Sequence, residues 1–289
     1  MVFKDSERFL IKNKLKKIPL VNFLLGLKRS LKNLLVKSYI RSEVCRVIYE
    51  CDRKEVLDVA TREVAEFTKE DFEIVKQKIL SGEDDTTYSW VRESPEEDGE
   101  ILDWYKNSKE MLYGQVGYAI HSNHLDILPY IRKILKKSYG DKRMKILDYG
   151  CGIGDHLIFL AKEGYNCSGT EVKSYSSEFI KHRMRKRGLD VHLIELTDNS
   201  APIEENYDVI ICLDVLEHTV NPREIIGRLF QKLNKGGLLF INFPHSEQPL
   251  HLEERHKDFD IDKELLGLGL TPMGIYWVKG GNDEKNNTL

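Results

Sequence analysis

Residues 146–154 read Ile-Leu-Asp-Tyr-Gly-Cys-Gly-Ile-Gly, with glycines at positions 150, 152 and 154. The apolar pair and the aspartate predict the end of a strand, and the helical pattern of His156–Lys162 follows directly. A strand that turns through alternating glycines into a helix lets the backbone approach a ligand closely, with free N–H groups at the helix start. We therefore expect a nucleotide-like cofactor at this turn.

The spacing of the glycines narrows the choice of cofactor. The dinucleotide fingerprint G-x-G-x-x-G would place its third glycine at position 155, which is an aspartate here. The Gly-Lys-Ser/Thr ending of a phosphate-binding P-loop is absent from the turn. The carboxylate of Asp148 would repel a pyrophosphate and suits a cationic or hydroxyl-rich ligand instead.

The rest of residues 145–245 predicts strands that alternate with helices. Further strands are expected at Asn166–Val172, Asp190–Leu196, Tyr207–Leu213 and Leu238–Phe243. The continuous apolar run of the fourth strand is typical of a central parallel strand, and Lys235–Gly237 is expected to end the helix before the fifth. This alternation of strands and helices predicts the α/β class, with a doubly wound, mostly parallel sheet and an added N-terminal helical region.

Three motifs together resemble one family. They are Asp-x-Gly-x-Gly-x-Gly at 148–154, Asp214-Val-Leu-Glu-His218 after the fourth strand, and Lys-Gly-Gly before the fifth. The chain resembles the class I (Rossmann-like) S-adenosylmethionine-dependent methyltransferases, in particular the ubiquinone-pathway enzymes and the type 11 and type 23 groups. The resemblance implies the class I methyltransferase fold and S-adenosyl-L-methionine as cofactor.

The expected cofactor site follows from these motifs. Glu171 ends the second strand, where a carboxylate can accept both ribose hydroxyls, and Asp198 is placed to accept from an adenine amine. A surface strand end for Glu171 and an ordinary turn for Asp198 remain alternatives. The thiol of Cys151 fills space in the loop and is not expected to act as a nucleophile. The complete expected set is Asp148, Tyr149, Gly150, Cys151, Gly152, Gly154, Glu171, Val172, Asp198, Leu213, Asp214 and Tyr113.

Histidines after the fourth and fifth strands are the expected catalytic groups. His218 and His245 follow strand ends where ligands of open parallel sheets bind, and a hydroxyl acceptor needs a base to remove its proton. His251 and His256 are further options. The resemblance includes ubiquinone-pathway enzymes that hold a divalent cation in an acidic-x-x-Glu-His cluster, here Asp214, Glu217 and His218. We favour a structural or substrate-facing role for His218 and expect no metal.

The N-terminal 110 residues are expected to form a helical, basic extension and lid ahead of a methyltransferase domain at 111–289. Residues 1–46 carry a net charge of +9 within a chain of net charge −3, and leucines recur there at helical spacing. Such a helix can contact an anionic membrane surface, bind an acidic partner or dock on its own core. The apolar run 18–27 is too short to span a membrane, and no cleavage site follows it. Residues 81–87 are expected to form a loop, and Tyr113 and Tyr118 to belong to the lid.

The expected acceptor is a small molecule methylated on oxygen or nitrogen. The acidic core lacks basic stripes interleaved with aromatics, and no Asn/Asp-Pro-Pro-Tyr follows the fourth strand, which disfavours nucleic acid. The alternatives are a lipid-linked or glycan substrate at the membrane surface and a non-catalytic binding module of the same fold. Five scattered cysteines predict free thiols in a reducing cytoplasm. The sequence leaves the oligomeric state open.

The C-terminal residues depart from the family pattern. A helix is expected at 262–268 and a sixth strand at 271–279. The antiparallel seventh strand would have to come from residues 280–289, which are polar and contain Gly-Asn-Asp. We therefore expect that strand to be short, poor or missing.

Overall fold

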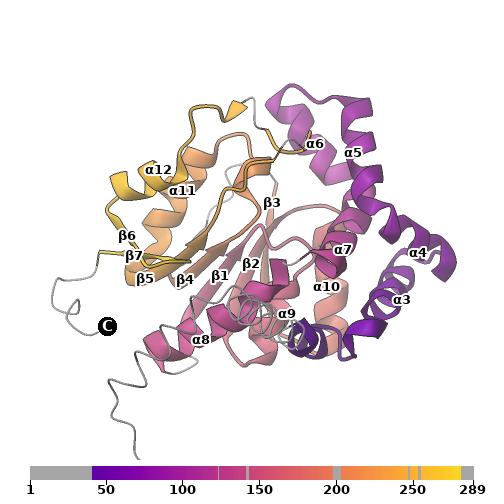
Figure 1. Cartoon of the computed structure of the whole chain (residues 1–289), viewed down its shortest axis with the longest axis horizontal. Coiled ribbons are helices and arrows are strands. Elements are labelled where there is room, and N and C mark those ends of the chain that lie inside the picture. The colour runs from indigo at the N-terminus through magenta and orange to yellow at the C-terminus, as the bar shows by residue number, and fades with distance from the viewer. Residues whose placement is uncertain are drawn as a thin grey trace, which may run out of the picture.

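A seven-stranded sheet forms the centre of the molecule (Figure 1). The computed structural model describes residues 41–122, 124–140, 143–197, 203–246, 248–252 and 255–280. The strand order is β3-β2-β1-β4-β5-β7-β6. The first five strands in this order run parallel, whereas β7 is antiparallel to both of its neighbours. The strands are β1 (Lys145–Tyr149), β2 (Asn166–Val172), β3 (His192–Leu196), β4 (Tyr207–Cys212), β5 (Leu233–Ile241), β6 (Leu270–Pro272) and β7 (Trp277–Lys279). The doubly wound, mostly parallel sheet predicted from the sequence is confirmed.

Helices cover both faces of the sheet and extend beyond one end of it. Those within the sheet region are α8 (Leu128–Tyr139), α9 (Asp155–Lys162), α10 (Tyr175–Arg187), α11 (Pro222–Lys232) and α12 (Ile261–Gly267), with single turns η2 (His124–Ile127) and η3 (Leu216–His218). The N-terminal region adds helical residues 41–48, η1 (Arg53–Glu55), α3 (Val56–Thr68), α4 (Phe72–Leu80), α5 (Gly82–Glu93), α6 (Asp98–Asn107) and α7 (Glu110–His121). None of the helices in the described ranges has the length and apolar character that a bilayer crossing needs.

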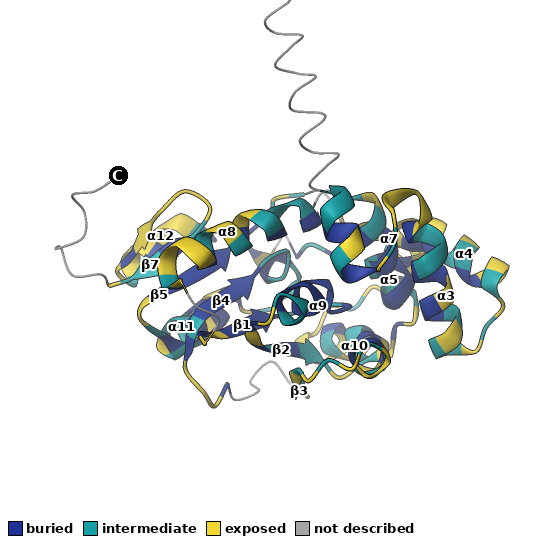
Figure 2. Cartoon of the chain, turned by 90° about the horizontal axis from the view of Figure 1, so that it is seen from below, coloured by how far each residue is buried: buried dark blue, intermediate teal, exposed yellow. Residues whose placement is uncertain are grey.

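Alternating side chains of the strands build two cores. Ile146, Val209 and Ile211 pack with α8, α9 and α10, whereas Leu147 and Ile210 pack with α11 and α12. Successive residues of a strand point to opposite faces, so a central strand must be apolar at every position. Figure 2 shows these strands as a buried layer between helices whose outer faces are exposed. Complete burial of each large aliphatic side chain contributes about 1.5–3 kcal/mol.

The Lys-Gly-Gly motif lies inside a strand, so its prediction as a helix end was wrong. Helix α11 ends at Lys232, and β5 begins at the next residue. Leu233 pairs with Tyr207 and Leu238 with Val209, so five steps along β5 match only two along β4. Residues 234–237 therefore form a bulge, and Gly236 supplies the positive φ of 76° that the bulge needs.

The C-terminal sheet edge also differs from its prediction. Residues 270–279 form two strands, β6 and β7, because Gly274 turns the chain with a φ of 82°. Met273 N–H donates to the Tyr276 carbonyl across this turn at 2.8 Å. Strand β7 lies antiparallel beside β5, pairing Trp277 with Leu239, and residues 281–289 lie outside the described ranges.

The loop predicted at 81–87 was wrong, because these residues begin α5. Glu83, Asp84 and Asp85 in its first turn are favourable at the positive end of the helix dipole. A side chain at Gly82 would lie 2.7 Å from the Tyr113 backbone, and one at Gly114 would lie 2.4 Å from Thr86 Oγ1. The two glycines thus let α5 and α7 pack at close range, which positions the N-terminal helices over the strand ends.

Candidate active site

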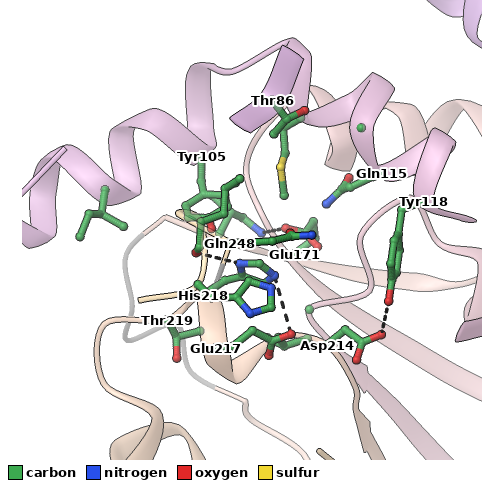
Figure 3. Close-up of a pocket in the computed structure, with 18 of the residues that line it drawn as sticks. Thr86, Tyr105, Gln115, Tyr118, Glu171, Asp214, Glu217, His218, Thr219 and Gln248 are labelled. Carbon is green, nitrogen blue, oxygen red and sulfur yellow. Dashed lines mark hydrogen bonds and ion pairs between the residues drawn. The ribbon is translucent and has the colours of Figure 1, made fainter. Parts of the chain in front are cut away.

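A cavity of about 440 Å³ lies where the carboxyl ends of β1, β2 and β4 meet the N-terminal helices (Figure 3). Its lining joins the glycine turn after β1 to α5, α6, α7, η3 and the segment 244–251. Open parallel sheets bind ligands at this end, where the strand order reverses between β1 and β4. Its volume is in the usual range of a small-molecule site, about 300–1,000 Å³.

The glycine turn forms the floor of one end of the cavity. Gly150, Gly152 and Gly154 have φ values of 70°, 55° and 80°, in the left-handed region that favours glycine. Gly150 N–H donates to Thr170 Oγ1 at 3.1 Å, and Cys151 N–H donates to the Thr170 carbonyl at 2.9 Å. A side chain at Gly152 would project toward the Gln115 amide, 3.6 Å away, and would narrow the cavity.

Glu171 ends β2 and faces the same end of the cavity. Its Oε2 accepts from Gly152 N–H at 2.7 Å, and its Oε1 accepts from Val172 N–H at 2.8 Å. Burial raises the pKa of this carboxyl to about 7, although the two backbone donors act in the opposite direction. The hydrogen bonds fix the carboxylate beside the glycine turn, with lone pairs left for hydroxyl groups of a ligand.

Asp148 lies beneath the turn and does not line the cavity. Its side chain is buried, and its Oδ1 lies 3.4 Å from Nδ1 of His156 on α9. Burial alone would lower the pKa of His156, but the nearby carboxylates of Asp148 and Asp155 outweigh it and raise that pKa. The pair places a carboxylate and an imidazole directly behind the loop backbone.

Helix α7 closes over the strand ends through two polar contacts. In the first contact, Tyr118 Oη on α7 donates to Asp214 Oδ2 at 3.1 Å. Asp214 is itself held by Asn242 Nδ2, which donates to Oδ1 at 2.7 Å. Ser176 Oγ donates to Gln115 Oε1 at 2.6 Å, which turns the amide NH₂ of Gln115 toward the cavity. Asp214 has a φ of 55°, an unusual conformation for aspartate, and holds the lid residue Tyr118 to the end of β4.

His218 stands at the opposite end of the cavity. Its Nδ1 lies 3.1 Å from the Leu250 carbonyl oxygen, which can only accept, so Nδ1 carries the proton and Nε2 is left unprotonated. Burial and the neighbouring His251 lower the pKa of His218 to about 4. Because this pKa lies well below physiological pH, the imidazole is a neutral base there. Its Nε2 lies 3.8 Å from Glu217 Oε1.

Glu217, His218 and His251 offer ligand atoms that all lie within 4.8 Å of one another. The sequence suggested Asp214 as the third member of this cluster, but both Asp214 oxygens accept hydrogen bonds from Tyr118 and Asn242. His251 from the 244–252 segment takes that place.

An apolar wall surrounds the His218 end. Trp90, Ile101, Trp104, Leu250 and Leu252 form a small core that joins α5 and α6 to the segment after β5. Tyr105 belongs to this wall and lines the cavity, with its ring centre 6.4 Å from that of His218. This small core positions the wall against η3.

The expected site residues fall into three groups. Tyr149, Gly150, Glu171, Val172, Asp214 and His218 line the cavity. Asp148, Cys151, Gly152, Gly154 and Leu213 lie in or behind the turn and the end of β4, outside its lining. Asp198 lies outside the described residues.

Three other expected residues are not brought to the cavity. Tyr113 is buried and donates to Glu70 Oε1 at 3.0 Å. His245 packs against Phe243, and His256 is buried with its Nε2 donating to the Thr219 carbonyl at 2.8 Å. Only Tyr118 of the two expected lid tyrosines faces the cavity.

Sequence reasoning missed Gln115 and Tyr105, which the lid brings to opposite ends of the cavity. Gln115 stands four residues after Met111 on the same helix face, and Tyr105 stands next to Trp104 in an aromatic run. The helical periodicity of both segments is visible in the sequence, but it does not show which face of each helix contacts the sheet.

Comparison of the sequence with curated proteins finds similar proteins of known activity. Two of the similar curated proteins are ubiquinone biosynthesis O-methyltransferases. The one from Rickettsia prowazekii is 31% identical over 140 residues, covering 48% of this chain and 53% of the relative. The one from Hydrogenovibrio crunogenus is 31% identical over 135 residues, covering 45% and 52%. The chain thus spans about half the length of the curated relatives it matches.

Solved structures with a partial likeness include two methyltransferases. One is an S-adenosylmethionine-dependent methyltransferase from Clostridium acetobutylicum, with a TM-score of 0.36, 17% identity and coverage of 39% of this chain and 47% of that one. The other is an amino pentose methyltransferase from Micromonospora echinaspora, with a TM-score of 0.34, 23% identity and coverage of 39% and 48%.

The fold and the glycine-turn site define the class I S-adenosylmethionine-dependent methyltransferases. The family described as a methyltransferase domain matches residues 120–265, and the chain belongs to that family. The cofactor of this class is S-adenosylmethionine, and the site fits it. A side chain at Gly150, which lines the cavity, would come within 2.6 Å of Val215, so the turn needs glycine there, and Glu171 presents a half-buried carboxylate for hydroxyl groups.

Proposed function

We propose that the protein transfers the methyl group of S-adenosylmethionine to a hydroxyl or amine of a small-molecule acceptor. The observation that carries this proposal is one continuous cavity with Glu171 and the glycine turn at one end and the neutral base His218 at the other. A cofactor end and a base that share one cavity are what a direct methyl transfer requires.

The residues that hold the cofactor each have a distinct part. Glu171 accepts the ribose hydroxyls, and the turn from Tyr149 to Gly154 approaches the ligand with its backbone. Gln115 presents its amide NH₂ from α7, where a carboxylate can accept it. When bound, the cofactor supplies an electrophilic methyl group on a positively charged sulfur.

His218 removes the proton of a hydroxyl acceptor. Its Nδ1–H is held by the Leu250 carbonyl, so Nε2 faces the cavity as the proton acceptor. Helix α7, latched by Tyr118 to Asp214, excludes water and aligns acceptor and cofactor. Alignment and proton removal are the tasks of the chain, because the sulfonium would leave as a neutral thioether and needs no proton from the protein.

Two measurements test the proposal. Calorimetry should show binding of S-adenosylhomocysteine to the wild type, and a loss of that binding in Glu171→Ala. Incubation with methyl-labelled cofactor and fractionated cell extract should transfer label to a soluble small-molecule fraction. No binding at millimolar ligand would refute the assignment, whereas binding without transfer to any fraction would favour a non-catalytic binding module.

A divalent cation at Glu217, His218 and His251 is the second candidate for the base end, because these three residues form a ligand cluster. We give preference to the metal-free base; a metal would occupy the same Nε2 of His218 that the base needs, so the two candidates exclude each other. Dialysis against a chelator should therefore leave the methyl transfer rate unchanged. A loss of transfer that is restored by one divalent metal would favour the second candidate.

A lipid-linked or glycan acceptor at a membrane surface remains the alternative substrate. It depends on peripheral contact through residues 1–46, most of which lie outside the described residues. Label that appears in the lipid fraction would favour it, and with it a membrane-peripheral rather than a purely cytoplasmic location.

A further inference from the structure

The wall of the acceptor end, as the described residues form it, is largely apolar. From α6, α7 and the segments after β4 and β5 it receives Ile101, Leu102, Met111, Val220 and Leu250. Among the described residues that line the whole cavity, none is lysine or arginine. Arg255, on the neighbouring segment, donates to Asp98 Oδ1 at 2.7 Å and to the Glu96 carbonyl, so it is bound to the outside of α6.

The described lining has four carboxyl groups, and its basic side chains are the two histidines His218 and His251. Glu83 stands at the exposed rim, Asp214 and Glu171 stand at the cofactor end, and Glu217 is buried beside His218 with 1% exposure. The Nδ1 of His218 is already engaged by the Leu250 carbonyl at 3.1 Å, so that nitrogen is not directed at a ligand. A positively charged sulfonium suits such a cavity, but an anion would have to enter it without a cationic partner.

One polar group of the wall, the hydroxyl of Tyr105, is buried and has no hydrogen-bond partner among the described residues. Buried hydroxyls are normally paired, and this one lies on a residue that lines the cavity close to His218. It can donate to, or accept from, an uncharged polar atom of a ligand.

We propose that the acceptor is an apolar molecule without negative charge, which carries an uncharged polar atom within reach of Tyr105. This inference rests on the proposed function and names its substrate class. It excludes acceptors that present a phosphate or a carboxylate inside the cavity. Each of those groups would require a guanidinium or ammonium that the described lining lacks.

Two probes with the same naphthalene body and different charge test the proposal. We would measure the binding of 2-naphthol and of 2-naphthoate by calorimetry to the full chain loaded with S-adenosylhomocysteine. The naphthol should bind more tightly by at least about tenfold, the ratio that corresponds to 1.4 kcal/mol. Loading is measured first, so that a failure of the proposed function, seen as no binding of S-adenosylhomocysteine, is distinguished from a failure of the charge selection.

A charge variant makes the test independent of the choice of probe. Leu102→Arg adds one cation to the half-buried wall of α6, and should close or reverse the difference by tightening 2-naphthoate about tenfold. Leu266→Arg is the matched control, because Leu266 is 56% exposed on α12 and does not line the cavity. The control changes the net charge equally and should leave both affinities unchanged.

The outcomes divide cleanly. Selective binding of the naphthol, with the difference closed or reversed in Leu102→Arg and unchanged in Leu266→Arg, supports the proposal. A difference that Leu102→Arg leaves unchanged overturns it. Equal or tighter binding of 2-naphthoate by the wild type overturns it. Binding of neither probe also overturns it, because the apolar wall would then not admit an uncharged aromatic body.

Discussion

The two ends of the cavity are built in different ways. The cofactor end comes mainly from one short stretch, β1, the glycine turn and β2, in which residues 145–172 contact one another within a single βαβ unit. The acceptor end is assembled from α5 and α6, η3 and the segment 244–252, which are far apart in the sequence. A local site can be read from a motif, whereas a site assembled from distant segments requires the fold.

The cofactor end also receives support from a buried charge network. Arg183 on α10 donates from Nη1 to the Ile153 carbonyl at 2.7 Å and to Asp155 Oδ1 at 2.6 Å. Its Nε donates to Glu63 of α3 at 3.2 Å, and Tyr49 donates to Asp155 at 3.0 Å. The N-terminal helices thus reach both ends: they cover the acceptor and they hold the glycine turn from behind.

The largest expected effect is at the acceptor end. His218→Ala should lower kcat by about 10²–10⁴-fold, the usual contribution of a positioned base. The affinity for S-adenosylhomocysteine should stay the same, because the glycine turn is untouched. His245→Ala is the control, since His245 packs on Phe243 and does not line the cavity. An equal loss in both variants, measured by steady-state kinetics, would refute the assignment of the base.

The next largest effect concerns the support of the cofactor end. Arg183→Met leaves the buried carboxylates of Glu63 and Asp155 without their shared guanidinium, and should lower the free energy of unfolding by about 3–5 kcal/mol. Lys186→Met on the same helix breaks only an exposed pair with Glu66 and should cost about 1 kcal/mol or less. Urea denaturation measures both.

If Arg183→Met does not fold, Glu63→Gln weakens the same buried ion pair with a smaller loss of stability and can be compared with Lys186→Met in its place. Cofactor affinity separates a positioning role from simple stabilisation. The folded variant should bind S-adenosylhomocysteine more weakly, because Arg183 holds the Ile153 carbonyl of the turn. Unchanged affinity in a destabilised but folded variant would show that the network serves stability alone.

The cofactor end of the cavity could largely be predicted from the sequence, whereas the acceptor end could not. Glycine spacing, Asp148 and Glu171 define the cofactor end because each needs only the geometry of one strand, one turn and one strand end. Tyr105 and Gln115 could not be found, because their place depends on how α5 packs on α7 through Gly82 and Gly114. The bulge at residues 234–237 and the hairpin of β6 and β7 depend on pairing between distant strands, which no local pattern specifies.

The two ends should also respond to pH in different ranges. Burial raises the pKa of Glu171 to about 7, so its carboxylate becomes protonated as the pH falls through that value and loses acceptors for the ribose hydroxyls. Cofactor affinity should be full above that pKa and should weaken below it, by at most about tenfold per pH unit.

The pKa of His218 is lowered to about 4, so this base stays unprotonated and kcat should fall only as the pH approaches that value. Calorimetry and kcat measured over the same pH series check both ends at once. Glu171→Gln is the control and should remove the pH dependence of cofactor binding without moving that of kcat. A kcat limb close to 6.5 would contradict the burial of His218.

A smaller effect is expected from a single methyl group in the turn. Gly152→Ala places a side chain at a φ of 55° and 3.6 Å from the Gln115 amide, where the turn and α7 would hold the cofactor between them, and should weaken cofactor binding by about tenfold. The left-handed backbone itself costs about 1–2 kcal/mol of stability. Gly188→Ala imposes the same kind of strain at a φ of 61° with nothing within 4 Å. Both variants should lose similar stability, but only Gly152→Ala should change the calorimetric affinity.

The smallest effect tests whether α7 joins the two ends. Tyr118→Phe removes the hydrogen bond to Asp214 and leaves the ring, which stacks on His124 with centres 4.8 Å apart. The loss of one hydrogen bond corresponds to about 0.5–1.5 kcal/mol, so the KM of the acceptor should rise by less than about tenfold. Tyr130→Phe, on the exposed face of α8, is the control and should change nothing. Because the latch holds the lid that carries Gln115 as well, cofactor affinity should fall by a similar factor. A change confined to the acceptor would show that α7 serves only one end of the cavity.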